Sequence, residues 1–179
     1  EEVGKAVVEQ IAKAVSGEVV DYPLNLPFVD KIKHPLVKPY TVLAEKMGNL
    51  VAQYIRFNPS WIKIAYGGEL SQVETEMIIL GFMKGYASRV LESFISYVNA
   101  TQACERLGLN FKESCEVAPH AFGYKSELRI VISGAQDEKA SFAGTVFDNR
   151  YLRLTEVERF RVEIKPKGTY LVIKNEDKP

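Results

Sequence analysis

Apolar residues in the first half of the chain recur every three or four positions, the spacing of one face of an α-helix. Apolar residues between positions 3 and 15 show this spacing and the pattern ends at Gly17, so we expect residues 1–17 to form the opening helix. A proline-rich connector over residues 18–39 should lack regular structure, and helices are then predicted over 36–55, 73–90 and 99–107. Ser71 followed by Glu74 has the form of a capping box and should begin the helix over 73–90.

Beyond Asn110 the apolar period shortens to two, which is typical of half-buried strands. In the clearest of these strands Leu128, Ile130 and Ile132 share one face. Further strands are expected over 141–147, 152–154, 159–165 and 169–174, with a bend at 155–157, and one short strand over 61–65 lies among the helices. A helical half followed by a mostly antiparallel sheet indicates the α+β class.

Composition excludes several classes of protein. The chain has 179 residues, of which 46% are hydrophobic, and a formal net charge of zero. It therefore lacks the excess of positive charge with which proteins bind nucleic acid or an anionic membrane nonspecifically. No apolar run approaches the roughly 20 residues that span a bilayer. Cys104 and Cys115 have neither CxxC spacing nor a nearby histidine, which argues against a metal centre and favours a reduced, cytoplasmic setting.

The sequence offers little catalytic chemistry. It contains neither GxGxxG nor GxxxxGK[ST], so no nucleotide cofactor is expected in this segment. His34 lies in the connector, where a solvated side chain is expected. His120 lies in a loop before a strand, and a catalytic base there would need a nucleophile and an orienting carboxylate that the sequence does not single out.

One predicted strand has a cationic face. Between residues 159 and 165, the side chains of Arg159, Arg161 and Lys165 alternate with apolar residues and share their face with Glu163. Arg153 lies eight residues before Arg161, across the predicted bend. Such a cluster predicts a receptor for a small phosphate or carboxylate, because guanidinium groups bind both bidentately. The alternative is a solvated sheet face.

A series of short motifs, in unbroken order along the chain, resembles the long, bacterial type of D-3-phosphoglycerate dehydrogenase. The segments are VEQIAKAVSGEVV (8–20), LNLP (24–27), LAEKMG (43–48), GEL (68–70), KG (84–85), YVNA (97–100), ERLG (105–108), GTVF (144–147), RVEI (161–164) and VIKNEDKP (172–179). The part of the enzyme that they resemble is the intervening, allosteric-substrate-binding domain.

The resemblance implies three regions. Residues 1–21 would be the last helix of the catalytic region, residues 22–170 the intervening domain, and residues 171–179 the first strand of a truncated ACT domain. The parent enzyme would oxidise 3-phosphoglycerate to 3-phosphohydroxypyruvate with NAD in serine biosynthesis, with its catalytic residues before Glu1. This segment would contribute homo-oligomer assembly and transmit effector binding.

The resemblance also implies ligand sites. The family's anion-binding positions near the last strands match Arg153, Arg161 and Lys165, which the strand alternation also singles out. A phosphate-bearing small molecule is therefore the expected ligand. The serine contacts of the ACT domain fall on Asn175 and Asp177, and L-serine would need the complete ACT domain.

The chain departs from the family pattern at two positions, with Gly67 where many relatives have arginine and Arg159 where they have glycine. Arg159 adds a cation beside the expected site and so bears on its anion preference. Two alternatives remain at this point: the related domain of an L-serine dehydratase, and a purely structural oligomerisation module.

Overall fold

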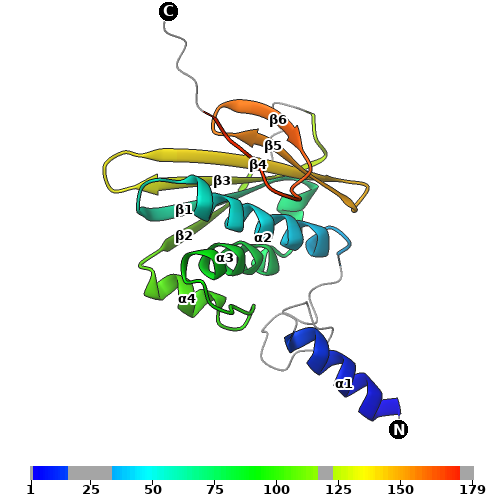
Figure 1. Ribbon diagram of the computed structural model, residues 1–179. Helices are drawn as coiled ribbons and strands as arrows, with labels where there is room; N and C mark the ends of the chain where they lie inside the picture. The colour runs from blue at the N-terminus through cyan, green and yellow to red at the C-terminus, as the bar shows by residue number, and fades with distance from the viewer. Residues whose placement is uncertain (1, 16–33, 117–122, 174–179) are drawn as a thin grey trace, which may run out of the picture.

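The computed structural model describes residues 2–15, 34–116 and 123–173 (Figure 1). In these ranges the helical elements come mainly first and the strands mainly last. The helices are α1 (Glu2–Val15), α2 (Val37–Tyr54), α3 (Glu76–Val90) and α4 (Ala100–Arg106), with a 3₁₀ helix η2 at Glu69–Gln72. The strands are β1 (Pro59–Gly68), β2 (Asn110–Glu116), β3 (Ser126–Gly134), β4 (Lys139–Phe147), β5 (Tyr151–Val157) and β6 (Phe160–Ile164).

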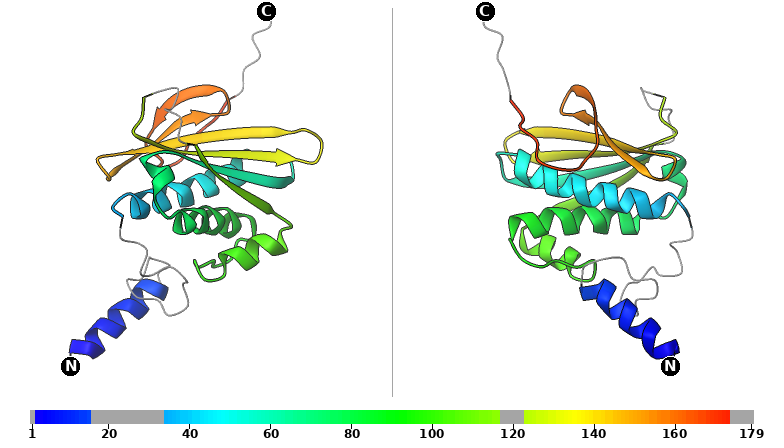
Figure 2. Two further views of the ribbon diagram at one scale, coloured as in Figure 1. Left: turned by 180° about the vertical axis from the view of Figure 1, so that it is seen from behind. Right: turned by 45° about the vertical axis from the view of Figure 1, so that its right-hand side comes forward.

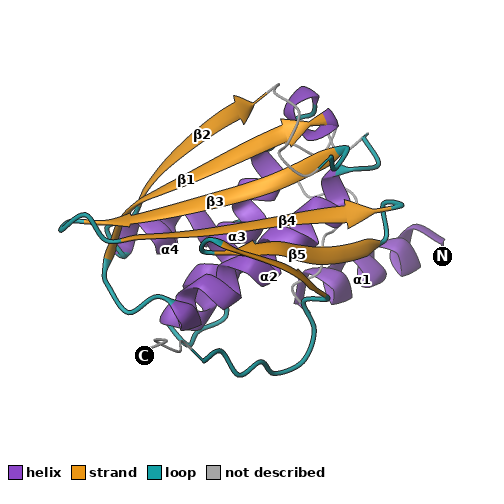
Figure 3. Cartoon of the chain, turned by 90° about the horizontal axis from the view of Figure 1, so that it is seen from above, coloured by secondary structure: helices purple, strands orange, loops and turns teal. Residues whose placement is uncertain are grey.

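The strands form a sheet in the order β2-β1-β3-β4-β5-β6. Every neighbouring pair is antiparallel except β1 and β2, which are parallel. Helices α2 and α3 lie side by side and cover one face of this sheet, while the other face is the one seen from above in Figure 3. The predicted α+β class is confirmed.

The core lies between the sheet and these two helices. Leu128, Ile130 and Ile132 are fully buried, as their alternation predicts, and Ile62 and Ile64 of β1 are buried with them. The helices contribute their apolar stripes, whose buried members include Tyr40, Leu43, Met47, Val51, Ile78 and Phe82. This burial explains why the 3.6-residue pattern predicts α2 and α3 correctly.

Glycines allow α2 and α3 to approach closely. A Cβ atom at Gly85 would lie 1.9 Å from the Glu45 carbonyl oxygen, and one at Gly81 would lie 2.5 Å from the Thr41 oxygen. From the other side, a Cβ atom at Gly48 would lie 2.3 Å from the Phe82 oxygen. Side chains at these positions would therefore force the helices apart.

The structure corrects several local predictions. Ser71 begins no α-helix: its hydroxyl donates to the Gly68 carbonyl at 2.7 Å, and α3 begins later, at Glu76. Residues 155–157 continue β5 instead of bending. No strand is present over residues 169–173. Residues 37–39, the end of the predicted connector, belong to α2 instead. Pro39 is compatible with the first turn of this helix, because a backbone N–H at that position would have no carbonyl partner within the helix.

Helix α1 extends away from the sheet and the other helices in Figures 1 and 2. Its apolar residues Val7, Val8, Ile11 and Val15 are all more than half exposed. The structure confirms the predicted helix, and these four apolar side chains of the helix are exposed instead of packed in the core. No helix in the described ranges is long and apolar enough to cross a membrane.

Candidate functional site

The predicted cations lie on the β5–β6 hairpin. Arg161, Glu163 and Lys165 are exposed and alternate with half-buried residues, as the sequence predicts. Arg161 is opposite Glu156 in the register. Arg153 and Lys165 each lie one residue beyond the Leu154–Ile164 pair, so the antiparallel register brings these two cations close to each other across the two strands.

Arg153 already has two partners in this hairpin. Its Nη1 donates to the Leu152 carbonyl at 2.9 Å, and its Nε lies 3.6 Å from Glu163 Oε1. The Arg153 side chain is 26% exposed, whereas that of Glu163 is 68% exposed. An ion pair of this length and exposure is weak, so Arg153 remains accessible to an incoming anion.

A turn after β6 fixes the backbone at Lys165. The Tyr170 hydroxyl donates to the Lys165 carbonyl and accepts a hydrogen bond from the Lys167 N–H at 2.8 Å. Residues 166–168 and Tyr170 also line a cavity of about 460 Å³ against α2, where Lys46 and Asn49 form part of the wall. Arg153, Arg161 and Lys165 do not line this cavity, although Lys165 directly precedes Pro166 of its wall.

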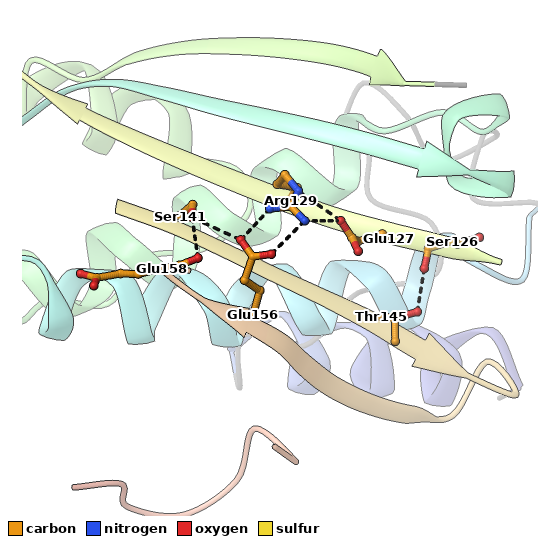
Figure 4. A network of polar contacts seen from close by, with 7 residues as sticks. All are labelled: Ser126, Glu127, Arg129, Ser141, Thr145, Glu156 and Glu158. Atoms are coloured by element: carbon orange, nitrogen blue, oxygen red, sulfur yellow. Dashed lines mark hydrogen bonds and ion pairs between the residues drawn. The ribbon is translucent and has the colours of Figure 1, made fainter. Parts of the chain in front are cut away.

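Sequence reasoning missed an ion network on the sheet face that the helices leave uncovered (Figure 4). Arg129 binds Glu156 through both terminal guanidinium nitrogens, at 2.7 and 3.2 Å, and its Nη2 lies 3.0 Å from Glu127 Oε1. The Ser141 hydroxyl lies 3.3 Å from the Glu156 carboxylate. Glu127 is only 1% exposed, and the Arg129 guanidinium group compensates the charge of this buried carboxylate.

Electrostatics in the network favour the ionised guanidinium. Burial lowers the pKa of Arg129, but the hydrogen bond that it donates to Glu156 and the charge of Glu127 outweigh this effect, and the pKa is raised overall. Arg161 lies opposite Glu156, which places the network beside the cationic face. In the sequence, the network could have been suspected only from Glu127 and Arg129, which alternation places on one strand face. Glu156 could not be connected with them, because it lay in a predicted bend.

The other residues singled out in the sequence form no second site within the described residues. The His34 Nδ1 accepts a hydrogen bond from the Leu36 N–H at 3.4 Å, in the segment leading into α2. His120, Asn175 and Asp177 lie outside the described residues. Within the described ranges, no group of three or more His, Cys, Asp or Glu side chains is placed to hold a metal ion.

Comparison with known proteins matches residues 36–158 to a family model described as the D-3-phosphoglycerate dehydrogenase intervening domain. The chain is similar to the D-3-phosphoglycerate dehydrogenase of Methanocaldococcus jannaschii, with 32% identity over 98% of the chain and 33% of the relative. The enzymes of the same name from Archaeoglobus fulgidus and Bacillus subtilis are 29% and 25% identical, over 99% and 98% of the chain and 33% of each relative. The chain thus spans about a third of the length of the curated relatives that it matches.

Proposed function

Since the chain belongs to the family of D-3-phosphoglycerate dehydrogenase intervening domains, we propose that it is the regulatory and assembly segment of such an enzyme. The names of its relatives support a parent protein that is a D-3-phosphoglycerate dehydrogenase. We propose that this parent oxidises 3-phosphoglycerate to 3-phosphohydroxypyruvate with NAD in the cytoplasm. This segment would carry no catalytic residue and no cofactor. Its partners would be a phosphate-bearing small molecule, L-serine once the ACT domain is complete, and further copies of the same chain.

The arrangement of the β5–β6 hairpin carries the anion-binding part of this proposal. Arg153, Arg161 and Lys165 lie on one hairpin, and the exposed side chains of Arg161 and Lys165 alternate with half-buried apolar residues. Two guanidinium groups and one ammonium group on such a face can bind the oxygens of a phosphate group. The resemblance described in the sequence analysis implies the same residues. An oxyanion would bind across the hairpin, between β5 and β6.

Calorimetric titration of this chain with inorganic phosphate tests the site. Charge-assisted hydrogen bonds contribute about 1.5–3 kcal/mol each, so Arg161→Ala should weaken phosphate binding about tenfold or more. The affinity should also fall with added salt, as expected of an exposed site. Arg161 is exposed on β6, so its loss should leave the unfolding midpoint almost unchanged.

Arg106→Ala is the matched control, because Arg106 is an exposed arginine on α4, outside the hairpin. It should bind phosphate as the wild type does. Equal binding by wild type and Arg161→Ala, or none by either at tens of millimolar phosphate, would contradict the anion site. The cations would then belong to a solvated sheet face that binds no ligand. The purely structural role would then remain for this segment.

A further inference from the structure

Glu163 occupies the centre of the cationic face. It alternates along the strand with Arg161 and Lys165, and all three side chains are exposed. Its Oε1 lies 3.6 Å from Arg153 Nε on the neighbouring strand. A carboxylate of the chain itself therefore lies where an incoming anion would meet the cations.

The Arg153 guanidinium has two edges that can bind an oxyanion bidentately, and Nη1 already donates one hydrogen bond to the Leu152 carbonyl at 2.9 Å. The edge that contains Nε is not engaged by that hydrogen bond and can receive a bidentate ligand. Glu163 faces this same nitrogen. An anion that binds Arg153 in this way must displace the Glu163 carboxylate.

We propose that Glu163 is a tethered competitor that weakens anion binding at Arg153, an inference that rests on the anion-binding function proposed above. A tethered group competes at an effective concentration in the millimolar range. Every anion that must displace Glu163 from Arg153 is weakened by the same factor. A phosphate dianion carries a second charge that attracts Arg161 and Lys165 as well, so it can still displace Glu163.

The exposure of Glu163 makes this displacement feasible. Exposed ion pairs contribute about 0.2–1 kcal/mol, so removal of the carboxylate should tighten phosphate binding by about 1.4- to fivefold. Acetate should gain by a similar factor, because both anions displace the same carboxylate. Glu163 thus lowers the affinity of Arg153 for anions in general.

Titration of wild type and Glu163→Gln with inorganic phosphate and with acetate tests the inference. Glu105→Gln removes an exposed carboxylate from α4 and controls for the general change of charge. We expect Glu163→Gln to bind both anions more tightly and by a similar factor, and Glu105→Gln to match the wild type. In Arg153→Ala the further change Glu163→Gln should give much less gain, which assigns the competition to Arg153.

The outcomes separate the two proposals. Phosphate binding that is equal in wild type and Glu163→Gln leaves the anion site in place and overturns the role of Glu163. An equal gain from Glu105→Gln also overturns it, since net charge would then explain the effect. Absence of binding by every variant overturns the site itself and Glu163 with it.

Discussion

Arg129 reaches from β3 to β5 because the residue between them is small. In the register Arg129 is opposite Ala143, and Ala143 is opposite Glu156, so the guanidinium group passes over a methyl group to meet the carboxylate. Both Glu156 oxygens accept its hydrogen bonds. Glu127, with 1% of its surface exposed, depends on the same guanidinium group.

Arg129→Met should therefore lower the free energy of unfolding by about 2 kcal/mol or more. The loss stays below the roughly 3–5 kcal/mol of a fully buried pair, because the Arg129 side chain is 29% exposed. Adding Glu127→Gln should recover about 1 kcal/mol, since the double variant buries no uncompensated carboxylate at that position. Urea unfolding of the three proteins measures both effects. If Arg129→Met were as stable as wild type, the network would contribute no net stability.

At the residue scale, sequence predicted the faces better than the partners. Alternation correctly places Glu127 and Arg129 opposite the core residues of β3, and it places Arg161, Glu163 and Lys165 on one side of β6. Glu156 could not be assigned in this way, because its partner lies two strands away. The strand register also shifts between Ala143 and Gly144 and between Leu154 and Glu156, which changes the residues that lie opposite each other. No local sequence pattern predicts these shifts.

At the scale of elements, the contact between α2 and α3 depends on backbone meeting backbone. Gly85→Ala would place a Cβ atom 1.9 Å from the Glu45 carbonyl oxygen, and no side chain can rotate to relieve that contact. Alanine favours a helix over glycine by about 1 kcal/mol, and overpacking costs about 1–3 kcal/mol or more. We expect the clash to dominate and the free energy of unfolding to fall by about 2 kcal/mol or more.

Gly4→Ala on α1 is the matched control, because nothing lies within 4 Å of a Cβ atom there. It should leave thermal unfolding unchanged or raise the helix content slightly. Circular dichroism measures both variants. A Gly85→Ala protein that unfolds at the wild-type temperature would show that the two helices can shift apart without loss.

The beginning of α3 shows why a local motif failed. The capping box read from Ser71 and Glu74 assumes that these side chains serve the following helix. In the structure Thr75 is the N-cap residue, and its hydroxyl donates to the Glu113 carboxylate on β2 at 3.0 Å. The Tyr66 hydroxyl donates to the same oxygen at 2.7 Å. Contacts between distant segments therefore fix where α3 begins, and a window of a few residues cannot reveal them.

At the scale of the whole molecule, the chain has a sheet with one helical layer and a separate amphipathic helix. The periodicity of apolar residues predicted this class and most element positions, because burial on one face repeats along each element. Periodicity could not predict that β1 and β2 pair in parallel, because this pairing joins residues about fifty positions apart in the sequence. The described α1 keeps its apolar stripe in solvent, which bears directly on assembly.

Sedimentation velocity should show that this chain associates. Val7, Val8, Ile11 and Val15 of α1 are 52%, 65%, 56% and 73% exposed, and a contiguous apolar stripe of this kind favours burial against another surface. Val8→Lys combined with Ile11→Lys should shift the population toward monomer while the α2–α3–sheet core unfolds at the same temperature. Val98→Lys, at a position with 56% exposure outside α1, should not change the distribution. A chain that stays monomeric from micromolar to millimolar concentration would contradict the assembly role of this segment. Association that survives the α1 changes would assign it instead to another surface.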